Sequence, residues 1–168
     1  NPIFFIPIKY IYTECLEILL NHKNMGISIF DIKNNNGLNI ILYALIKNNY
    51  DILKLITKIN FSYDILDNNN NTIYHYIAKY STIDIAKLFK IDNNIINNQN
   101  KFGESCLHVA INFNNNDIIE WILHNSKINL NIKDYKYELT AIHYAIVNNK
   151  INLLDIQNID FNIQDFKG

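Results

Sequence analysis

Residues 103–110, GESCLHVA, place a serine, a cysteine and a histidine within four positions: Ser105, Cys106 and His108. A hydroxyl or thiol beside an imidazole is the arrangement of nucleophilic catalysis, because the base removes the proton that keeps the nucleophile inactive. The stretch is therefore a candidate hydrolase site. The same residue types also serve structure, since a serine at the start of a helix accepts a free backbone N–H.

The pattern recurs along the chain, and the recurrence distinguishes the two interpretations. Two further pairs have the same three-residue spacing: Thr72 with His75, and Thr140 with His143. Residues 37–44 carry the pattern with Asn39 and Leu42 in the polar positions, and residues 1–6 match it in part. A catalytic site is not expected once per structural unit. We therefore interpret Ser105 as a helix cap and His108 as its hydrogen-bonding partner.

Metal and phosphate chemistry are not expected either. The three histidines of the pattern are spaced along the chain at about one per repeat and are predicted to be buried, which is a poor arrangement for a tetrahedral metal site. The chain has only four glycines, and they form no phosphate-binding loop. We predict a non-enzyme with no catalytic residue, no cofactor and no metal.

Each copy of the pattern opens with an Asn or Asp, and in every copy but the one at Asp134 a Gly or Asn follows three residues later. The openers are Asn34, Asp67, Asn100, Asp134 and Asp165, and they lie 33, 33, 34 and 31 residues apart. An Asn or Asp side chain can start a turn by accepting backbone N–H groups, and glycine suits a position with positive φ. Self-similarity at such a fixed period is typical of a solenoid.

A second apolar segment follows each motif, with apolar residues at helical i, i+3, i+4 spacing. These segments are residues 15–20, 50–56, 82–89, 116–123 and 151–156. Each repeat is therefore expected to contain a turn, a capped inner helix and an outer helix. Two departures stand out: Pro7 predicts a short or kinked first inner helix, and the turn DYKYELT has one extra residue and no glycine.

A turn and two helices per period, with a motif like Thr-Pro-Leu-His-x-Ala, resembles the ankyrin repeat. The resemblance covers essentially the whole chain, because five copies keep register. It implies an all-α fold, an ankyrin-repeat α-solenoid of helix-turn-helix repeats with β-hairpin connections, curved with a concave face. The predicted single domain, 1–168, divides into repeats 1–33 (partial), 34–66, 67–99, 100–133 and 134–164, with 165–168 opening a further repeat.

Composition argues against several other classes. The formal net charge is −1, from 15 basic and 16 acidic residues, so no electrostatic basis exists for binding nucleic acid. No apolar run approaches the ~20 residues of a membrane span, and the first residues do not resemble a signal peptide. Cys15 and Cys106 are predicted to be buried free thiols in a reducing compartment. We expect a monomer in the cytoplasm, or in the host-cell cytoplasm if the source is a virus or an intracellular pathogen.

Isoleucine and asparagine each make up roughly a fifth of the chain, far above average usage. Lysine supplies every basic residue, and no arginine occurs. Codons for these common residues are AT-rich, which indicates an AT-rich genome such as that of a protozoan, an intracellular bacterium or a large DNA virus. We attribute most asparagines to this bias.

The resemblance also implies where a partner would bind. Ankyrin arrays generally hold other proteins on the concave side, through the hairpin tips and the ends of the inner helices. From these two rows we predict eight partner-binding residues: Lys47, Tyr80, Lys101, Phe102, Phe113, Tyr135, Lys136 and Phe166. Aromatic residues beside cations are typical of interface hot spots. The alternative is that these aromatics pack locally between hairpins or continue into further repeats.

Two classes of function follow from the resemblance. The first is a non-catalytic scaffold that binds a protein or peptide on its concave face. The second is a targeting or regulatory module of a larger enzyme or ubiquitin-ligase adaptor, whose catalytic or recruiting domain lies outside this chain. Both ends of the chain fall inside a repeat motif, so we expect a fragment of a longer array.

Overall fold

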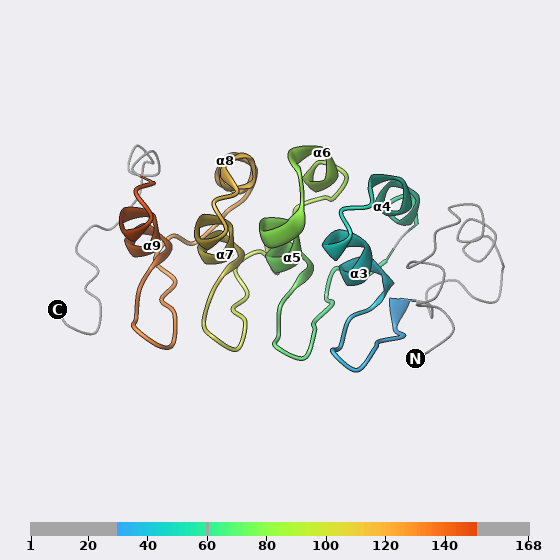
Figure 1. Ribbon diagram of the computed structural model, residues 1–168, viewed down its shortest axis with the longest axis horizontal. Helices are drawn as coiled ribbons and strands as arrows, with labels where there is room; N and C mark the ends of the chain where they lie inside the picture. Colours follow the sequence, from blue (N-terminus) through green and yellow to red (C-terminus); the bar gives the residue numbers. More distant parts are fainter. Residues whose placement is uncertain (1–29, 60, 151–168) are drawn as a thin grey trace.

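The computed structural model describes residues 30–59 and 61–150. Within them, the helices follow in the order α3 (Ile40–Ile46), α4 (Tyr50–Ile56), α5 (Ile73–Tyr80), α6 (Ile83–Ala86), α7 (Cys106–Asn112), α8 (Asn116–Asn125) and α9 (Ala141–Val147). Figure 1 shows α4, α6 and α8 in an outer layer and α3, α5, α7 and α9 in an inner layer, from which hairpin loops project. The sequence motifs at 1–29 and 151–168 lie outside the described residues.

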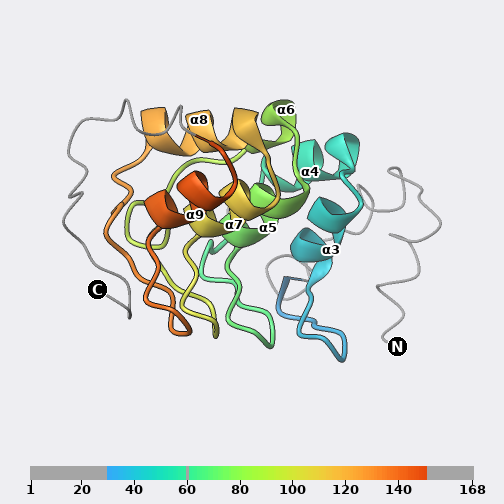
Figure 2. The same cartoon turned by 60° about the vertical axis from the view of Figure 1, so that its left-hand side comes forward.

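Adjacent repeats pack helix on helix within each layer. In the inner layer α5 lies between α3 and α7, and α7 contacts α9; in the outer layer α6 lies between α4 and α8. Figure 2 shows the same stacking after rotation, with the loops side by side below the inner helices. The small residues Ala44, Ala110 and Ala145 are fully buried, which lets neighbouring helices approach closely.

The hairpin loops are closed by the predicted turn residues. The side-chain Oδ1 of Asn34, Asp67, Asn100 and Asp134 each accepts two backbone N–H groups of its own turn. Gly37, Asn70 and Gly103 have positive φ angles of 77°, 60° and 81°. In the turn with the extra residue, Glu138 takes the positive-φ conformation (55°) in place of a glycine. The turn chemistry predicted from the sequence is thus confirmed.

Two features of the predicted elements differ from the structure. The hairpin loops carry only an isolated bridge, Lys133 to Thr140, and no strand occurs among the described residues. The outer helix predicted over 82–89 is α only from Ile83 to Ala86. Leu88 and Phe89 continue it with tighter hydrogen bonds to residues three positions back, at 3.0 Å each, which is a 3₁₀-type ending.

Asparagines occupy specific structural positions, which the composition-based interpretation did not foresee. Asn39 and Asn49 cap the starts of α3 and α4 with their side chains. Asn48, Asn114 and Asn149 adopt positive φ just after inner helices, a conformation that asparagine tolerates better than other side chains. Whatever the genomic origin of its abundance, asparagine therefore serves as a helix-cap and turn residue in this fold.

Two of the pattern histidines, His75 and His108, each join two repeats. In the repeats 67–99 and 100–133, Nδ1 accepts the backbone N–H of the capping residue, at 3.1 Å for His75 and 3.2 Å for His108. Nε2 donates to a carbonyl of the next repeat, Glu104 for His75 (2.9 Å) and Leu139 for His108 (3.2 Å). Because a carbonyl can only accept, these partners assign the proton to Nε2 and make both rings neutral.

Replacing His108 with alanine is expected to lower the free energy of unfolding by about 1–2 kcal/mol, because it leaves buried groups of two repeats without their partner. His108 is fully buried. Chemical denaturation of the variant measures the change. His124→Ala, at an exposed histidine of α8, is the matched control and is expected to change stability little. An unchanged midpoint for His108→Ala would contradict this role.

Candidate protein-binding face

The serine, cysteine and histidine of the opening stretch lie together but are closed to solvent. Ser105 Oγ is 2.8 Å from His108 Nδ1, and the exposed fractions of Ser105, Cys106 and His108 are 1%, 0% and 0%. Burial raises the pKa of Cys106 to about 12, so the sulfur stays a thiol, and it donates to the carbonyl of Ile96. With no access for a substrate, the group is structural, as the repeated pattern predicts.

The predicted partner-binding residues lie on the inner layer and the loop tips. Lys47 and Phe113 are the C-cap residues of α3 and α7, and Tyr80 is the last residue of α5. The tip residues Lys101, Phe102, Tyr135 and Lys136 are exposed. Phe166 lies outside the described residues.

Exposure differs among the aromatic residues of this set. The exposed fractions are 47% for Phe113, 60% for Phe102 and 67% for Tyr135. Tyr80 is half-buried, and its ring packs against Tyr76 with the centroids 5.8 Å apart. Local packing therefore buries part of the Tyr80 ring, whereas the rings of Phe113, Phe102 and Tyr135 stay largely exposed.

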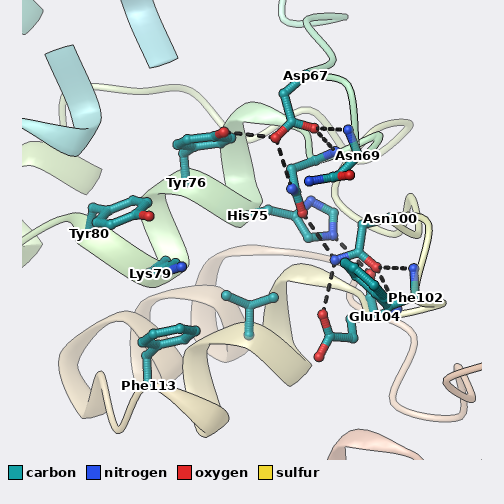
Figure 3. A pocket seen from close by; sticks show the side chains of 12 residues that line it. Asp67, Asn69, His75, Tyr76, Lys79, Tyr80, Asn100, Phe102, Glu104 and Phe113 are labelled. Carbon is teal, nitrogen blue, oxygen red and sulfur yellow. Dashed lines mark hydrogen bonds between the residues drawn. The ribbon is translucent and has the colours of Figure 1, made fainter. Parts of the chain in front are cut away.

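A lysine that the sequence analysis did not select joins two of these rings. Lys79 Nζ lies 5.0 Å from the ring centroid of Tyr80 and 4.5 Å from that of Phe113, which belongs to the next repeat. Such distances allow a cation–π interaction with both rings. Figure 3 shows the three side chains gathered at one end of a cavity between α5 and α7.

The cavity has a volume of about 290 Å³ and extends from these helix ends to the bases of two hairpin loops. Its lining is Asp67, Asn69, Asn71, His75, Tyr76, Lys79, Tyr80, Asn100, Phe102, Glu104, Val109 and Phe113. Aromatic and lysine side chains thus form one end, and carboxylates and amides form the other (Figure 3). The two ends therefore differ in charge: Lys79 makes one end positive, and the carboxylates of Asp67 and Glu104 make the other negative.

Asp67 is held ionised at the loop end. Partial burial favours protonation, but hydrogen bonds from Asn71, Tyr76 and Asn69 outweigh it, so the pKa of Asp67 lies below its ordinary value. Oδ1 accepts the backbone N–H groups of Asn69 and Asn71, and Oδ2 accepts the Asn71 amide and the Tyr76 hydroxyl. All the acceptor positions of this carboxylate are used within its own repeat.

The loop tips carry the remaining exposed aromatics and are joined to one another. The backbone N–H of Lys101 donates to Asn69 O, and that of Tyr135 donates to Phe102 O, each at 2.9 Å. Lys136 Nζ lies 4.5 Å from the ring of Tyr137. These backbone hydrogen bonds link the tips of successive hairpins and so fix the positions of Phe102 and Tyr135 relative to each other.

Several residues of the cavity were missed by sequence reasoning. Lys79 was overlooked because it is not at the repeat position of Lys47 and Phe113, although its place beside Tyr80 was a usable signal. Asp67 was assigned to a turn, and Glu104 was given no role. Their place in one cavity with Lys79 and Phe113 depends on how neighbouring repeats stack, for which the sequence gives no direct signal.

Residues 30–59 and 61–150 contain neither a metal-binding cluster nor a membrane-spanning helix. No group of three or more His, Cys, Asp or Glu side chains is placed there to hold a metal ion. In the same part of the chain no helix has the length and apolar character needed to cross a bilayer.

Comparison with known proteins gives consistent matches. The family model for ankyrin repeats matches residues 59–134 and 75–165. An ankyrin repeat protein of Acanthamoeba polyphaga mimivirus is 29% identical over 175 residues, covering 100% of this chain and 22% of the relative. One from fowlpox virus is 31% identical over 117 residues, covering 69% of this chain and 27% of the relative. The chain thus spans only about a quarter of these relatives.

Among solved structures, the ankyrin repeat domain of Bcl-3, described as a unique member of the IkappaB protein family, superposes with a TM-score of 0.81. The match covers 100% of this chain and 76% of that one, at 18% sequence identity. At this identity the likeness concerns the fold alone.

Proposed function

Since the chain belongs to the ankyrin repeat family, whose domains generally mediate protein–protein interaction, we propose that it is a non-catalytic scaffold. It binds a protein or peptide on the inner face formed by α5, α7 and the hairpin tips. The binding residues proposed are Tyr80, Phe102, Phe113 and Tyr135, with the lysines Lys47, Lys101 and Lys136 around them, and Phe166 in the part not described.

One observation carries the proposal: Lys79 lies over the rings of Tyr80 and Phe113 at one end of an open cavity, which the exposed Phe102 also lines. Aromatic rings bury a large area with little loss of conformational freedom, which is why they are enriched in hot spots. The hydrogen bonds between loop tips support it further, because a rigid surface loses less entropy on binding.

Affinity capture from cytosolic extract, read by mass spectrometry, tests the proposed face. We expect the chain to capture a partner that the double variant Tyr80→Ser/Phe113→Ser loses, because both rings of the cavity end are removed. Tyr50→Ser is the matched control: Tyr50 is an exposed aromatic of the outer helix α4, also with a lysine, Lys54, over its ring. The control is expected to keep the partner.

Thermal unfolding must first show that all variants are folded. The same partners on wild type and double variant would place the binding surface elsewhere. No partner on any variant would contradict a protein-binding function of this face.

The wider context of the chain is also a proposal. Because the curated relatives are several times longer than the matched region, we propose that the array is one module of a longer protein. If the source is a virus, as for these two relatives, we propose that the chain acts on host proteins in the cytoplasm. Domain content outside these 168 residues decides between the scaffold and the enzyme-module alternatives. The monomeric state and the proposed repeat boundaries stay predictions.

A further inference from the structure

The Glu104 carboxylate, in the cavity between α5 and α7, has no counterion and one hydrogen bond within the described residues. Glu104 is half-buried, and Asn100 Nδ2 reaches its Oε2 at 3.0 Å. No other hydrogen bond to this carboxylate, and no ion pair with it, occurs in the described part of the chain. Asp67, the other carboxylate of the cavity, already has its acceptor positions filled. Glu104 is therefore the acid available to a ligand.

The lysine of the same cavity does not neutralise Glu104. Lys79 lies over the rings of Tyr80 and Phe113 at the opposite end, and it forms no ion pair with Glu104 (Figure 3). Two carboxylates against one ammonium leave the lining with a net negative charge, since His75 is neutral. A cavity of this charge favours a cationic occupant.

The walls beside Glu104 suit a cation on an apolar stem. Phe102, 60% exposed, lies next to Glu104 (Figure 3), and Val109 and Phe113 supply apolar surface in the lining of the same cavity. An aromatic face attracts a guanidinium or ammonium group, and an aliphatic stem packs on apolar side chains. At about 290 Å³ the cavity has room for one long side chain.

We propose that this cavity binds a single basic side chain, arginine or lysine, from the partner segment held on the inner face. Glu104 pairs with the charged head, Phe102 covers it, and Val109 and Phe113 contact the stem. The inference rests on the proposed protein-binding function and adds the chemistry that the partner must carry. Nothing in the repeat motif itself requires Glu104, because its position in the next copy is occupied by Leu139 after the longer turn.

Selection of peptides from a phage-displayed library of random 12-residue sequences on the full 168-residue chain tests the proposal. We expect the selected peptides to share one position fixed as arginine or lysine. A synthetic peptide from the selection should bind Glu104→Gln about tenfold more weakly than wild type, because the neutral amide keeps the shape but loses the charge. Replacing the fixed basic residue by norleucine should cost a similar factor, and the two losses should not add.

Glu120→Gln is the matched control, since it removes the same charge from the exposed face of α8. It should bind the peptide like wild type. Comparing arginine with lysine at the fixed position then shows which head group the cavity prefers. Equal melting temperatures for the three proteins exclude unfolding as the cause.

The outcomes separate this inference from the proposed function. Peptides that are lost on Tyr80→Ser/Phe113→Ser but bind Glu104→Gln as tightly as wild type, with no fixed basic residue, would overturn the inference and leave the binding face in place. Failure to enrich any peptide over an unrelated folded protein would overturn both.

Discussion

Replacing Gly103 with alanine is expected to lower the free energy of unfolding by about 3 kcal/mol, a large change for a surface loop. Gly103 has a φ of 81°, a conformation that costs an alanine about 1 kcal/mol. A Cβ there would also lie 2.7 Å from two ring carbons of Tyr135, and closer still to the Tyr135 backbone nitrogen. Because that nitrogen donates to Phe102 O, relief would require breaking the bond between the two hairpin tips.

Two control variants separate the backbone cost from the steric cost. Asn70 holds the equivalent turn position, with a φ of 60°, and already carries a Cβ. Asn70→Ala therefore measures the positive-φ cost alone, and we expect about 1 kcal/mol. Gly103→Asn tolerates the φ angle but keeps the contact with Tyr135, so it should remain clearly destabilised. Urea denaturation of the three variants gives the values, and equal losses for Gly103→Ala and Asn70→Ala would refute the steric contribution.

The contrast between Gly103 and Asn70 also shows what the sequence can and cannot provide. Both positions were predicted from the spacing to their openers, because positive φ follows from the local turn chemistry. The contact of Gly103 with Tyr135 could not be predicted, since it depends on the distance between neighbouring hairpins. Local geometry is encoded within each repeat, whereas the spacing between repeats results from packing.

The same distinction applies to the candidate site. The exposure of Phe102, Phe113 and Tyr135 could be predicted by aligning the repeats, because equivalent positions form rows at the hairpin tips and at the ends of the inner helices. Lys79 and Glu104 were not selected, because neither belongs to the repeating motif and the cavity that both line forms only where two repeats pack together. Residues outside the motif are free to differ between repeats, and they are therefore the ones that make one part of the inner face specific.

Acidification from pH 7 to pH 4.5 is expected to remove about 2–3 kcal/mol of stability through His75 alone. Burial lowers the pKa of His75 from 6.5 to about 4, against the smaller opposing effects of its bond to Glu104 and of Asp67. Well above pH 6.5 neither the folded nor the unfolded chain binds a proton at His75, so the contribution of this residue to stability is complete. As the pH falls below 6.5 the unfolded chain takes the proton first, and stability is lost until the pH reaches the folded pKa near 4.

Burial also lowers the pKa of His108 from 6.5, so the contributions of both inter-repeat histidines to stability begin to be lost as the pH falls below 6.5. Asp67 titrates at lower pH: its pKa is lowered from 3.8, so its contribution to stability is lost only below that pH.

The free energy of unfolding, measured by urea denaturation at several pH values between 4.5 and 7.5, tests whether His75 causes the loss. His75→Gln should be less stable than wild type at pH 7.5 and should lose less stability on acidification, because the titrating group is gone. His124→Gln should keep the wild-type dependence, since His124 is exposed. An identical acid sensitivity of His75→Gln and wild type would show that the inter-repeat histidine is not the group that titrates.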